Sequence, residues 1–355
     1  MQSLEIRENV PLAPLTTLGV GGPAKYFVEA ADLTQLTAAL SEAQYRDIPA
    51  FILGGGSNVV VADAGFDGMV VKIALGGNKF EVAEAENHAV RVTVGSGMDW
   101  DVFVARCAEA DLAGVECLSG IPGTVGGTPI QNVGAYGQDV SESIVEVACL
   151  DRESLASVAF TNTDCQFAYR SSIFNREMRD RYVVLWVTFE LLRGGQPKIV
   201  YKDLIERFEG SSPTLEQVRD AVLKIRAAKS MVIDPNDPNS RSAGSFFKNP
   251  IVPLSKLVAL RKKFTALVSF PAGENAKLSA AWLIENAGFY KGYRKGTVGI
   301  STRHSLAIVN LGGATAADVV VLHEEIMAAV DARFGIPLIP EPIFIGFESS
   351  GIISV

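Results

Sequence analysis

Residues 118–137 read LSGIPGTVGGTPIQNVGAYG, and six of these twenty residues are glycine. No charged residue occurs between Glu116 and Asp139. Glycine permits a positive φ and close approach to the main chain, and successive N–H groups can form a concave nest for an anion. A loop this long in a compact domain is usually functional or disordered. Disordered segments are typically charged and poor in hydrophobic residues, and this segment lacks both features. The segment therefore predicts a ligand wrapped by main chain, with a plain surface loop as the alternative.

Length and charge narrow the class of protein. A chain of 355 residues exceeds one ordinary core, so we expect two or three domains. The net charge of −8 argues against a general nucleic-acid-binding protein. Residues 221–304, however, hold fourteen Lys or Arg against four Asp or Glu, a local charge of +10. This segregation suggests an anionic ligand in the C-terminal third, although a solvated basic surface would have the same composition.

The cysteines and histidines form no recognisable site. No C-x-x-C pair joins the four cysteines, which excludes the common zinc and thioredoxin patterns and favours a reducing compartment. Three scattered histidines give no metal constellation. The N-terminus lacks the apolar region of a signal peptide, and no apolar run approaches eighteen residues. We expect a cytoplasmic protein without a metal ion or a membrane partner.

Hydrophobic periodicity predicts short strands and helices without regular βα alternation, which indicates an α+β fold. The expected strands cover 50–53, 59–62, 89–94, 143–149 and 182–192. The expected helices cover 33–46, 100–112, 216–228, 254–264, 276–287 and 316–334. Asp32 and Asp99 are suited to cap the first two helices, and Gly335 to end the last.

Three polar or reactive side chains lie on or beside the apolar stripes of these expected helices. On helical spacing, Cys107 is interpreted as a small core residue and His323 as a packed helix residue. Glu285 is interpreted as a structural ion-pair partner. None of the three is expected to act in the chemistry.

A second glycine loop, Gly54-Gly-Gly-Ser-Asn58, joins one short apolar strand to another. A dinucleotide fingerprint or Walker loop would instead open a helix, and neither motif is present. If the loop holds a phosphate it does so as a nest, with Ser57 and Asn58 adding side-chain donors. A tight hairpin is an equally good interpretation of this stretch alone.

Five segments, taken in order, resemble a known family. They are Gly54-Gly-Gly-Ser-Asn58, Gly120-Ile-Pro-Gly-Thr-Val-Gly-Gly127, Tyr169-Arg-Ser-Ser-Ile-Phe174, Gly244-Ser-Phe-Phe-Lys-Asn249 and Pro340-Glu-Pro-Ile-Phe-Ile-Gly346. Together they are similar to the UDP-N-acetylenolpyruvoylglucosamine reductases, flavoenzymes of peptidoglycan precursor synthesis. The resemblance runs from about Asn9 to Gly346. Its most specific part is Ala243-Gly-Ser-Phe-Phe-Lys-Asn-Pro250.

The resemblance implies an FAD-binding domain of the vanillyl-alcohol-oxidase (PCMH) type, made of two subdomains, and a separate α+β substrate-binding domain. We expect the first subdomain over residues 1–75, with a tail of about 336–355 returning to it, and the second over 76–225. The substrate-binding domain is expected over 226–335. The expected oligomeric state is a monomer.

The implied cofactor is FAD, with NADPH as co-substrate. The first glycine loop would cradle the FAD pyrophosphate, residues 120–127 would lie against it and the flavin, and an arginine would add a further contact. The expected contacts are Gly54, Gly55, Gly56, Ser57, Asn58, Gly120, Ile121, Pro122, Gly123, Thr124, Gly127 and Arg226. NADPH is implied by the resemblance alone, because we see no local signature for its 2′-phosphate.

The implied reaction reduces UDP-N-acetyl-enolpyruvoylglucosamine to UDP-N-acetylmuramate, with hydride delivered to C3 and a proton to C2. Charge that grows at C2 spreads into the substrate carboxylate. Arg170 offers a planar fork for that carboxylate, and a protonated Glu341 could hydrogen-bond the same group. In the family pattern Ser245 donates the proton to C2, and Lys248 is a candidate to assist it from proximity alone.

Three further residues match the family's substrate-binding positions. Lys229 and Asn249 stand where the family holds the diphosphate and neighbouring groups. Tyr201 matches the extra substrate-gripping tyrosine that one form of the family has. Taken singly, the catalytic candidates have plainer interpretations: Arg170 as a stacked surface arginine, Glu341 as a turn cap and Ser245 as a turn residue.

Two departures limit the transfer of roles. Residues 230–242 form a longer loop than expected, and His304 and Ser305 stand where relatives vary, so no role is assigned to them. The rival functions are another FAD-dependent oxidase or dehydrogenase on the same fold, or a flavin- or nucleotide-sugar-binding module without catalysis. Bleaching of a bound flavin by NADPH, and its recovery with the enolpyruvyl sugar, would separate them.

Overall fold

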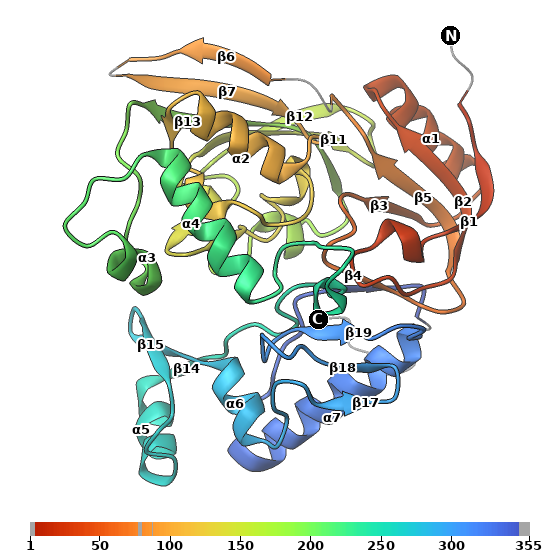
Figure 1. Ribbon diagram of the computed structural model, residues 1–355. Helices are drawn as coiled ribbons and strands as arrows, with labels where there is room; N and C mark the ends of the chain where they lie inside the picture. Colours follow the sequence, from red (N-terminus) through yellow and green to blue (C-terminus); the bar gives the residue numbers. More distant parts are fainter. Residues whose placement is uncertain (1–3, 77–79, 87, 348–355) are drawn as a thin grey trace. The chain divides into compact units, whose positions relative to one another are not determined.

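The computed structural model describes residues 4–76, 80–86 and 88–347, which fall into two compact units (Figure 1). The larger unit comprises the residues up to 10 with residues 24–55 and 67–232. The smaller unit comprises residues 11–23, 56–66 and those from 233 onward. Each unit is therefore assembled from separate parts of the chain. The domain boundaries expected from the sequence, near residues 75, 225 and 335, stay a prediction.

The first sheet of the larger unit has four strands in the order β1-β2-β5-β3. Their bounds are Arg7–Pro11 (β1), Pro23–Ala30 (β2), Phe66–Ile73 (β5) and Ala50–Leu53 (β3). Helix α1, Leu33–Tyr45, begins where Asp32 accepts a hydrogen bond from Gln35 N at 2.8 Å. Its buried residues, which include Leu36 and Leu40, join a core with those of β2 and β5.

The second sheet of the larger unit is antiparallel and has the order β12-β11-β13-β7-β6, with β8 paired to the end of β13. Their bounds are Ser157–Thr161 (β12), Ile144–Asp151 (β11), Tyr182–Arg193 (β13), Ala89–Gly95 (β7), Phe80–Glu84 (β6) and Leu112–Ala113 (β8). The predicted alternation in β7 is confirmed, because Val90, Val92 and Val94 are buried and Arg91 is exposed. The other short strands of this unit are β9 (Gly134–Ala135) and β10 (Gln138–Asp139).

Helix α2, Trp100–Glu109, lies over the buried face of this sheet. Asp99 caps it, as predicted, by accepting a hydrogen bond from Val102 N at 3.0 Å. Trp100 and Phe103 pack on Phe189 of β13 with ring centroids 5.9 and 4.7 Å away. The interpretation of Cys107 as a core residue is confirmed, since its side chain is fully buried in this core. Burial raises the pKa of its thiol. The remaining helices of the unit are α3, Lys202–Arg207, and α4, Leu215–Ala228.

The smaller unit packs two three-stranded sheets and a parallel strand pair with three helices (Figure 1). One sheet has the order β14-β16-β15, the other β17-β18-β19, and β20 pairs with β4. Strand bounds are Ile251–Pro253 (β14), Asn275–Leu278 (β16), Ser269–Ala272 (β15), Arg294–Lys295 (β17), Val298–Ile300 (β18), Ile308–Asn310 (β19), Ile343–Ile345 (β20) and Val59–Val61 (β4). Helix bounds are Leu254–Lys263 (α5), Ala280–Asn286 (α6) and Ala316–Phe334 (α7).

The structure corrects two expectations. The hairpin interpretation of Gly54–Asn58 is wrong, because β3 pairs with β5 in one sheet while β4 pairs with β20 in another. The helix predicted over 276–287 is also wrong at its start. Residues up to Leu278 form β16, whose register with β14 and β15 supplies the hydrogen bonds, and α6 begins only after the cap at Ser279.

Helix α7 ends, as predicted, at Gly335, whose φ of 61° is left-handed. His323 on this helix is 2% exposed and lies against the rings of Phe246 and Phe344, so its interpretation as a packed residue is confirmed. Burial lowers the pKa of His323 below its ordinary value of 6.5, because the charged imidazolium loses its hydration.

We therefore expect the free energy of unfolding to depend on His323 in mildly acidic solution. The unfolded state binds the proton at about pH 6.5, whereas the folded state resists it. This contribution to stability is full above that pH and is lost as pH falls toward the lower folded pKa. His323→Leu should flatten this part of the curve in denaturant titrations, and the matched change at exposed His88, His88→Asn, should leave it unaltered. An unchanged slope in His323→Leu would contradict the assignment.

Candidate active site

The glycine segment, residues 118–137, is anchored in the larger unit by its main chain. Leu118 O accepts a hydrogen bond from Trp100 Nε1 at 2.9 Å, and Gly126 N donates to Ser96 O at 2.9 Å. Gly120 N donates to Asp101 Oδ1 at 2.5 Å, and this carboxylate is also held by Arg219 of α4 at 2.5 and 2.8 Å. Burial opposes ionisation of Asp101, but the Arg219 and Gly120 hydrogen bonds outweigh it and lower its pKa. The segment is therefore an ordered platform.

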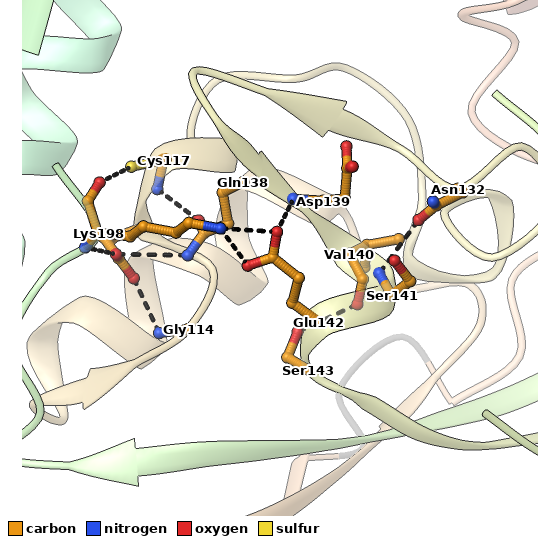
Figure 2. A network of polar contacts seen from close by, with 11 residues as sticks. Gly114, Cys117, Asn132, Gln138, Asp139, Val140, Ser141, Glu142, Ser143 and Lys198 are labelled. Carbon is orange, nitrogen blue, oxygen red and sulfur yellow. Dashed lines mark hydrogen bonds and ion pairs between the residues drawn. The ribbon is translucent and has the colours of Figure 1, made fainter. Parts of the chain in front are cut away.

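Polar contacts tie the flanks of the glycine segment together, among them those of Gln138, Glu142 and Lys198 (Figure 2). Glu116 is 2% exposed, and its carboxylate accepts hydrogen bonds from Gly114 N and Lys198 N, both at 2.8 Å. Gln138 Oε1 accepts from Cys117 N at 2.9 Å, so both ends of the segment meet here. Lys198 Nζ also reaches Glu142 Oε2 at 2.6 Å. The chain leading from Lys198 to Tyr201 is thereby fixed to the glycine segment.

The two glycine loops approach each other within the larger unit. A Cβ added to Gly55 would fall within van der Waals contact of Gly123, 2.8 Å from its carbonyl carbon, and one on Gly54 would lie 3.1 Å from Thr124 Oγ1. Lys72 Nζ of β5 donates to Gly54 O. Burial lowers the pKa of Lys72, only partly offset by Glu29. Only glycine permits this main-chain contact. The partly buried ammonium group of Lys72 lies beside the same loop.

Arg226 of α4 is 6% exposed and lies under the start of the glycine segment. Its Nε donates to Gly120 O at 3.1 Å and its Nη2 to Met231 O at 2.7 Å. Burial lowers its pKa, and the phenol of Tyr136 and the carboxylate of Asp101 oppose that shift. This buried guanidinium brings positive charge to a segment that has none of its own.

Two predicted substrate residues meet in one cluster of the larger unit. The rings of Tyr136 and Tyr201 pack edge to face with centroids 5.1 Å apart, and Lys229 Nζ lies 5.9 Å from the Tyr136 centroid. Lys229 Nζ is also 3.6 Å from Asp203 Oδ2. Burial raises the pKa of both tyrosines, so their phenols remain neutral donors near neutral pH. The cluster can donate hydrogen bonds and positive charge to an anionic ligand.

Arg170 has a left-handed main chain, with a φ of 52°. Its Nη2 donates to Gly134 O at 2.9 Å, its carbonyl accepts from Asn175 Nδ2 at 3.2 Å, and its Cζ lies 5.4 Å from the Tyr169 centroid. A positive φ is costly for a long side chain and concentrates at functional sites. The structure is therefore compatible with both interpretations of Arg170, a stacked arginine and an arginine that binds a ligand.

The smaller unit holds Ser245 and Glu341 in neighbouring segments. Phe246 N donates to Leu306 O at 2.8 Å, and Phe246 O accepts from Glu341 N at 2.9 Å. Asn58 Nδ2 donates to Glu341 O at 3.1 Å, which joins the end of the first glycine loop to the same group. These bonds hold Glu341 in an extended segment, one residue after a bridge between Phe247 and Pro340.

Other predicted contacts of this unit have main-chain or capping roles. Gly56 has a φ of 67°, and Thr17 N donates to its carbonyl at 3.0 Å. Asn249 Oδ1 accepts from Ala280 N at 2.9 Å at the start of α6. Glu285, interpreted from the sequence as an ion-pair partner, accepts a hydrogen bond from Ser305 Oγ instead.

Three candidate residues were missed by the sequence reasoning: Lys72, Tyr136 and His304. Lys72 interrupts the apolar run of β5, which is a readable signal. Tyr136 stands inside the quoted glycine segment but was given no role. His304 Nε2 lies 3.1 Å from Ser245 Oγ across 59 residues of sequence, and no local pattern announces that contact.

The described part of the chain contains no group of three or more His, Cys, Asp and Glu side chains suited to a metal ion. Within that same part, every helix is too short or too polar to cross a membrane.

Comparison with known families matches both regions of the chain. A model described as FAD binding domain matches residues 24–154, and one described as UDP-N-acetylenolpyruvoylglucosamine reductase, C-terminal domain, matches residues 235–345. A UDP-N-acetylenolpyruvoylglucosamine reductase of Thermobifida fusca is 48% identical over 95% of this chain and 97% of its own length. Its counterpart in Streptomyces coelicolor is 44% identical over 98% and 92%.

A solved structure of the same kind of reductase, from Thermus caldophilus, is 25% identical and covers 97% of this chain and 99% of its own. Its TM-score against this chain is 0.66. The α+β fold, the FAD-binding region and the ordered glycine segment define the chain as an FAD-dependent oxidoreductase. On its near full-length similarity to these relatives, the chain belongs to the UDP-N-acetylenolpyruvoylglucosamine reductase family.

Proposed function

We propose that this chain reduces UDP-N-acetyl-enolpyruvoylglucosamine to UDP-N-acetylmuramate, a step of peptidoglycan precursor synthesis, with electrons from NADPH. The observation that carries the proposal is the similarity to named reductases over 95% of the chain. The residues below supply the chemistry that such a reaction requires.

The larger unit fits FAD. The contact of Gly55 with Gly123 leaves bare main chain where a side chain would intrude, and buried Arg226 and partly buried Lys72 add positive charge beside it. We assign the pyrophosphate to Gly54–Asn58 and the flavin to residues 120–127 with Arg226. FAD, when bound and reduced by NADPH, supplies the hydride for C3 of the enolpyruvyl group.

Arg170 would bind the substrate carboxylate, into which negative charge spreads from C2. A guanidinium offers two parallel donors to a carboxylate, and its positive φ is the kind of strain found where a side chain is aimed for function. Glu341, protonated, would hydrogen-bond the same group as charge grows. Removing one such donor typically costs about 10²–10³ in rate.

Ser245 would donate the proton to C2. Its neighbour Phe246 is fixed by main-chain bonds to Leu306 and Glu341, so the hydroxyl is carried by a rigid segment. Tyr201 and Lys229, clustered with Tyr136, would hold the substrate diphosphate, and Asn249 a neighbouring group. The local charge of +10 over residues 221–304 suits two ligands with phosphate groups.

We further propose that the protein acts in the cytoplasm as a monomer. All four cysteines are unpaired and buried, as is usual in a reducing compartment.

The test is spectroscopic. Purified protein should carry a yellow flavin, NADPH should bleach it without oxygen, and the enolpyruvyl sugar should restore the oxidised spectrum. A colourless protein that takes up no FAD would contradict the proposal. Bleaching without recovery on adding the sugar would favour another flavin oxidase or dehydrogenase, and bound flavin that NADPH leaves oxidised would favour a binding module.

A further inference from the structure

A histidine lies at hydrogen-bond distance from the hydroxyl to which we assign the proton transfer. His304 Nε2 is 3.1 Å from Ser245 Oγ, and both side chains are partly buried in the smaller unit. His304 lies on the turn between β18 and β19, whereas Ser245 precedes β14. The pair therefore forms only in the folded unit.

The turn that carries His304 is held from two other elements. Asn239 Oδ1, within the short 3₁₀ turn Pro238–Ser240, accepts from Thr302 N at 2.9 Å and from Thr302 Oγ1 at 3.2 Å. On the other side of His304, Ser305 Oγ donates to Glu285 of α6. The long loop over 230–242, which had no role from the sequence, thus supports this turn.

The segment that carries Ser245 is held to the same turn. Phe246 N donates to Leu306 O at 2.8 Å, so the residue after the serine pairs with the second residue after the histidine. This main-chain bond holds the two segments together beside the contact between Oγ and Nε2.

A serine hydroxyl needs such a partner to act as an acid. Its alkoxide is strongly basic in water, so proton loss must be coupled to stabilisation or replacement of the proton. The sequence suggested Lys248 for this task on proximity alone. In the structure the group within hydrogen-bond distance of Oγ is the imidazole of His304, the side chain whose charge changes near neutral pH.

We propose that His304 supplies Ser245 with its proton, a role that rests on the function proposed above. As the C2–H bond forms, the Oγ–H bond of Ser245 breaks, and the electron pair at C2 that follows hydride addition to C3 takes that proton. Oγ regains a proton from Nε2 of the His304 imidazolium, which becomes neutral imidazole. Water then returns a proton to His304. His304 acts through Ser245 and is a positioning residue.

Charged groups of both signs lie on the segments around the pair. Arg303 precedes His304 on the turn, and Glu285 of α6 is bound to Ser305. Asp237 lies on the loop that holds the turn, where its carboxylate accepts from Asn239 N. Lys248 and Glu341 lie on the segments hydrogen-bonded around Ser245.

The first experiment compares wild type with His304→Gln after anaerobic reduction by NADPH. Glutamine keeps a hydrogen-bonding side chain but cannot ionise. Flavin reoxidation by the enolpyruvyl sugar should slow by at least about tenfold at pH 7, because proton transfer typically contributes about 10²–10⁴ in rate. Flavin reduction by NADPH should be unchanged. Wild-type reoxidation should fall as pH rises through the imidazole titration, and the variant should lose this limb.

Non-additivity separates a role through Ser245 from a general structural one. In a Ser245→Ala background, His304→Gln should cost little more, because the hydroxyl that it serves is already gone. A rate and pH profile like those of wild type in His304→Gln would overturn the proposal, as would fully additive losses. If His304→Gln does not fold, the wild type decides: reoxidation that is flat from about pH 5.5 to 8.5 overturns it. Failure of wild type itself to be reoxidised by the sugar would instead reject the proposed function, and this inference with it.

Discussion

Ser245→Ala should abolish most turnover of the enolpyruvyl sugar while leaving the flavin fully reducible by NADPH. The hydroxyl is assigned to protonation at C2, and loss of a positioned general acid typically costs about 10²–10⁴ in rate. The reductive half-reaction does not involve C2, so it has no reason to change. Stopped-flow measurement of each half-reaction separates the two effects.

Ser242→Ala is the matched control for this variant. Ser242 lies in the same segment and accepts a hydrogen bond from Gly244 N at 3.2 Å, but it has no assigned role in the chemistry. It should retain both half-reactions, with at most a small loss of stability. Equal losses of both half-reactions in Ser245→Ala would show that the serine supports the fold or the flavin, and would reject its role as proton donor.

Gly55→Ala should yield protein without bound FAD and with lowered stability. A methyl group at residue 55 would fall inside van der Waals contact of the Gly123 main chain, 2.8 Å from its carbonyl carbon. Because that neighbour is backbone, it can move only by shifting the glycine segment that we assign to the flavin. Overpacking of this kind typically costs about 1–3 kcal/mol. Flavin absorbance per protein and the melting temperature measure the two effects.

Gly127→Ala provides the steric comparison in the same segment. An added Cβ at Gly127 meets nothing within 4 Å, and the residue is exposed, so the protein should fold and melt as wild type. Any loss of flavin in Gly127→Ala would therefore come from a clash between the added methyl group and the bound flavin, because the methyl group meets no part of the protein. Normal FAD content and stability in Gly55→Ala would contradict the assignment of the two loops to the cofactor.

Much of the fold could be predicted because it depends on local rules. Asp32 and Asp99 cap the expected helices, Gly335 ends α7, and β7 alternates as its period-two pattern requires. Each of these features depends on a few adjacent residues, which satisfy the local hydrogen bonds or backbone geometry by themselves. The start of the predicted helix at 276 was wrong because residues up to Leu278 pair with strands β14 and β15, and this pairing overrode helical spacing.

The candidate site divides in the same way. The glycine segment and the segments of Arg170, Ser245 and Glu341 could be selected from the sequence because each is a contiguous motif. His304 could not, because it becomes notable only through its contact with Ser245, 59 residues away in sequence, whereas Lys72 has a readable signal in the apolar run of β5. Glu285 was assigned an ion pair, yet the chain turns Ser305 toward it.

By itself the sequence determined the family of the chain, the class of its ligand and the identity of its main-chain loops, because glycine content, charge distribution and short motifs are properties of adjacent residues. Only the tertiary structure decided that the two glycine loops touch at Gly55 and Gly123, that Arg226 is buried beneath one of them, and that an imidazole reaches Ser245. These contacts join residues tens to more than a hundred positions apart. They depend on strand register and helix packing, which are set by the burial of the whole core.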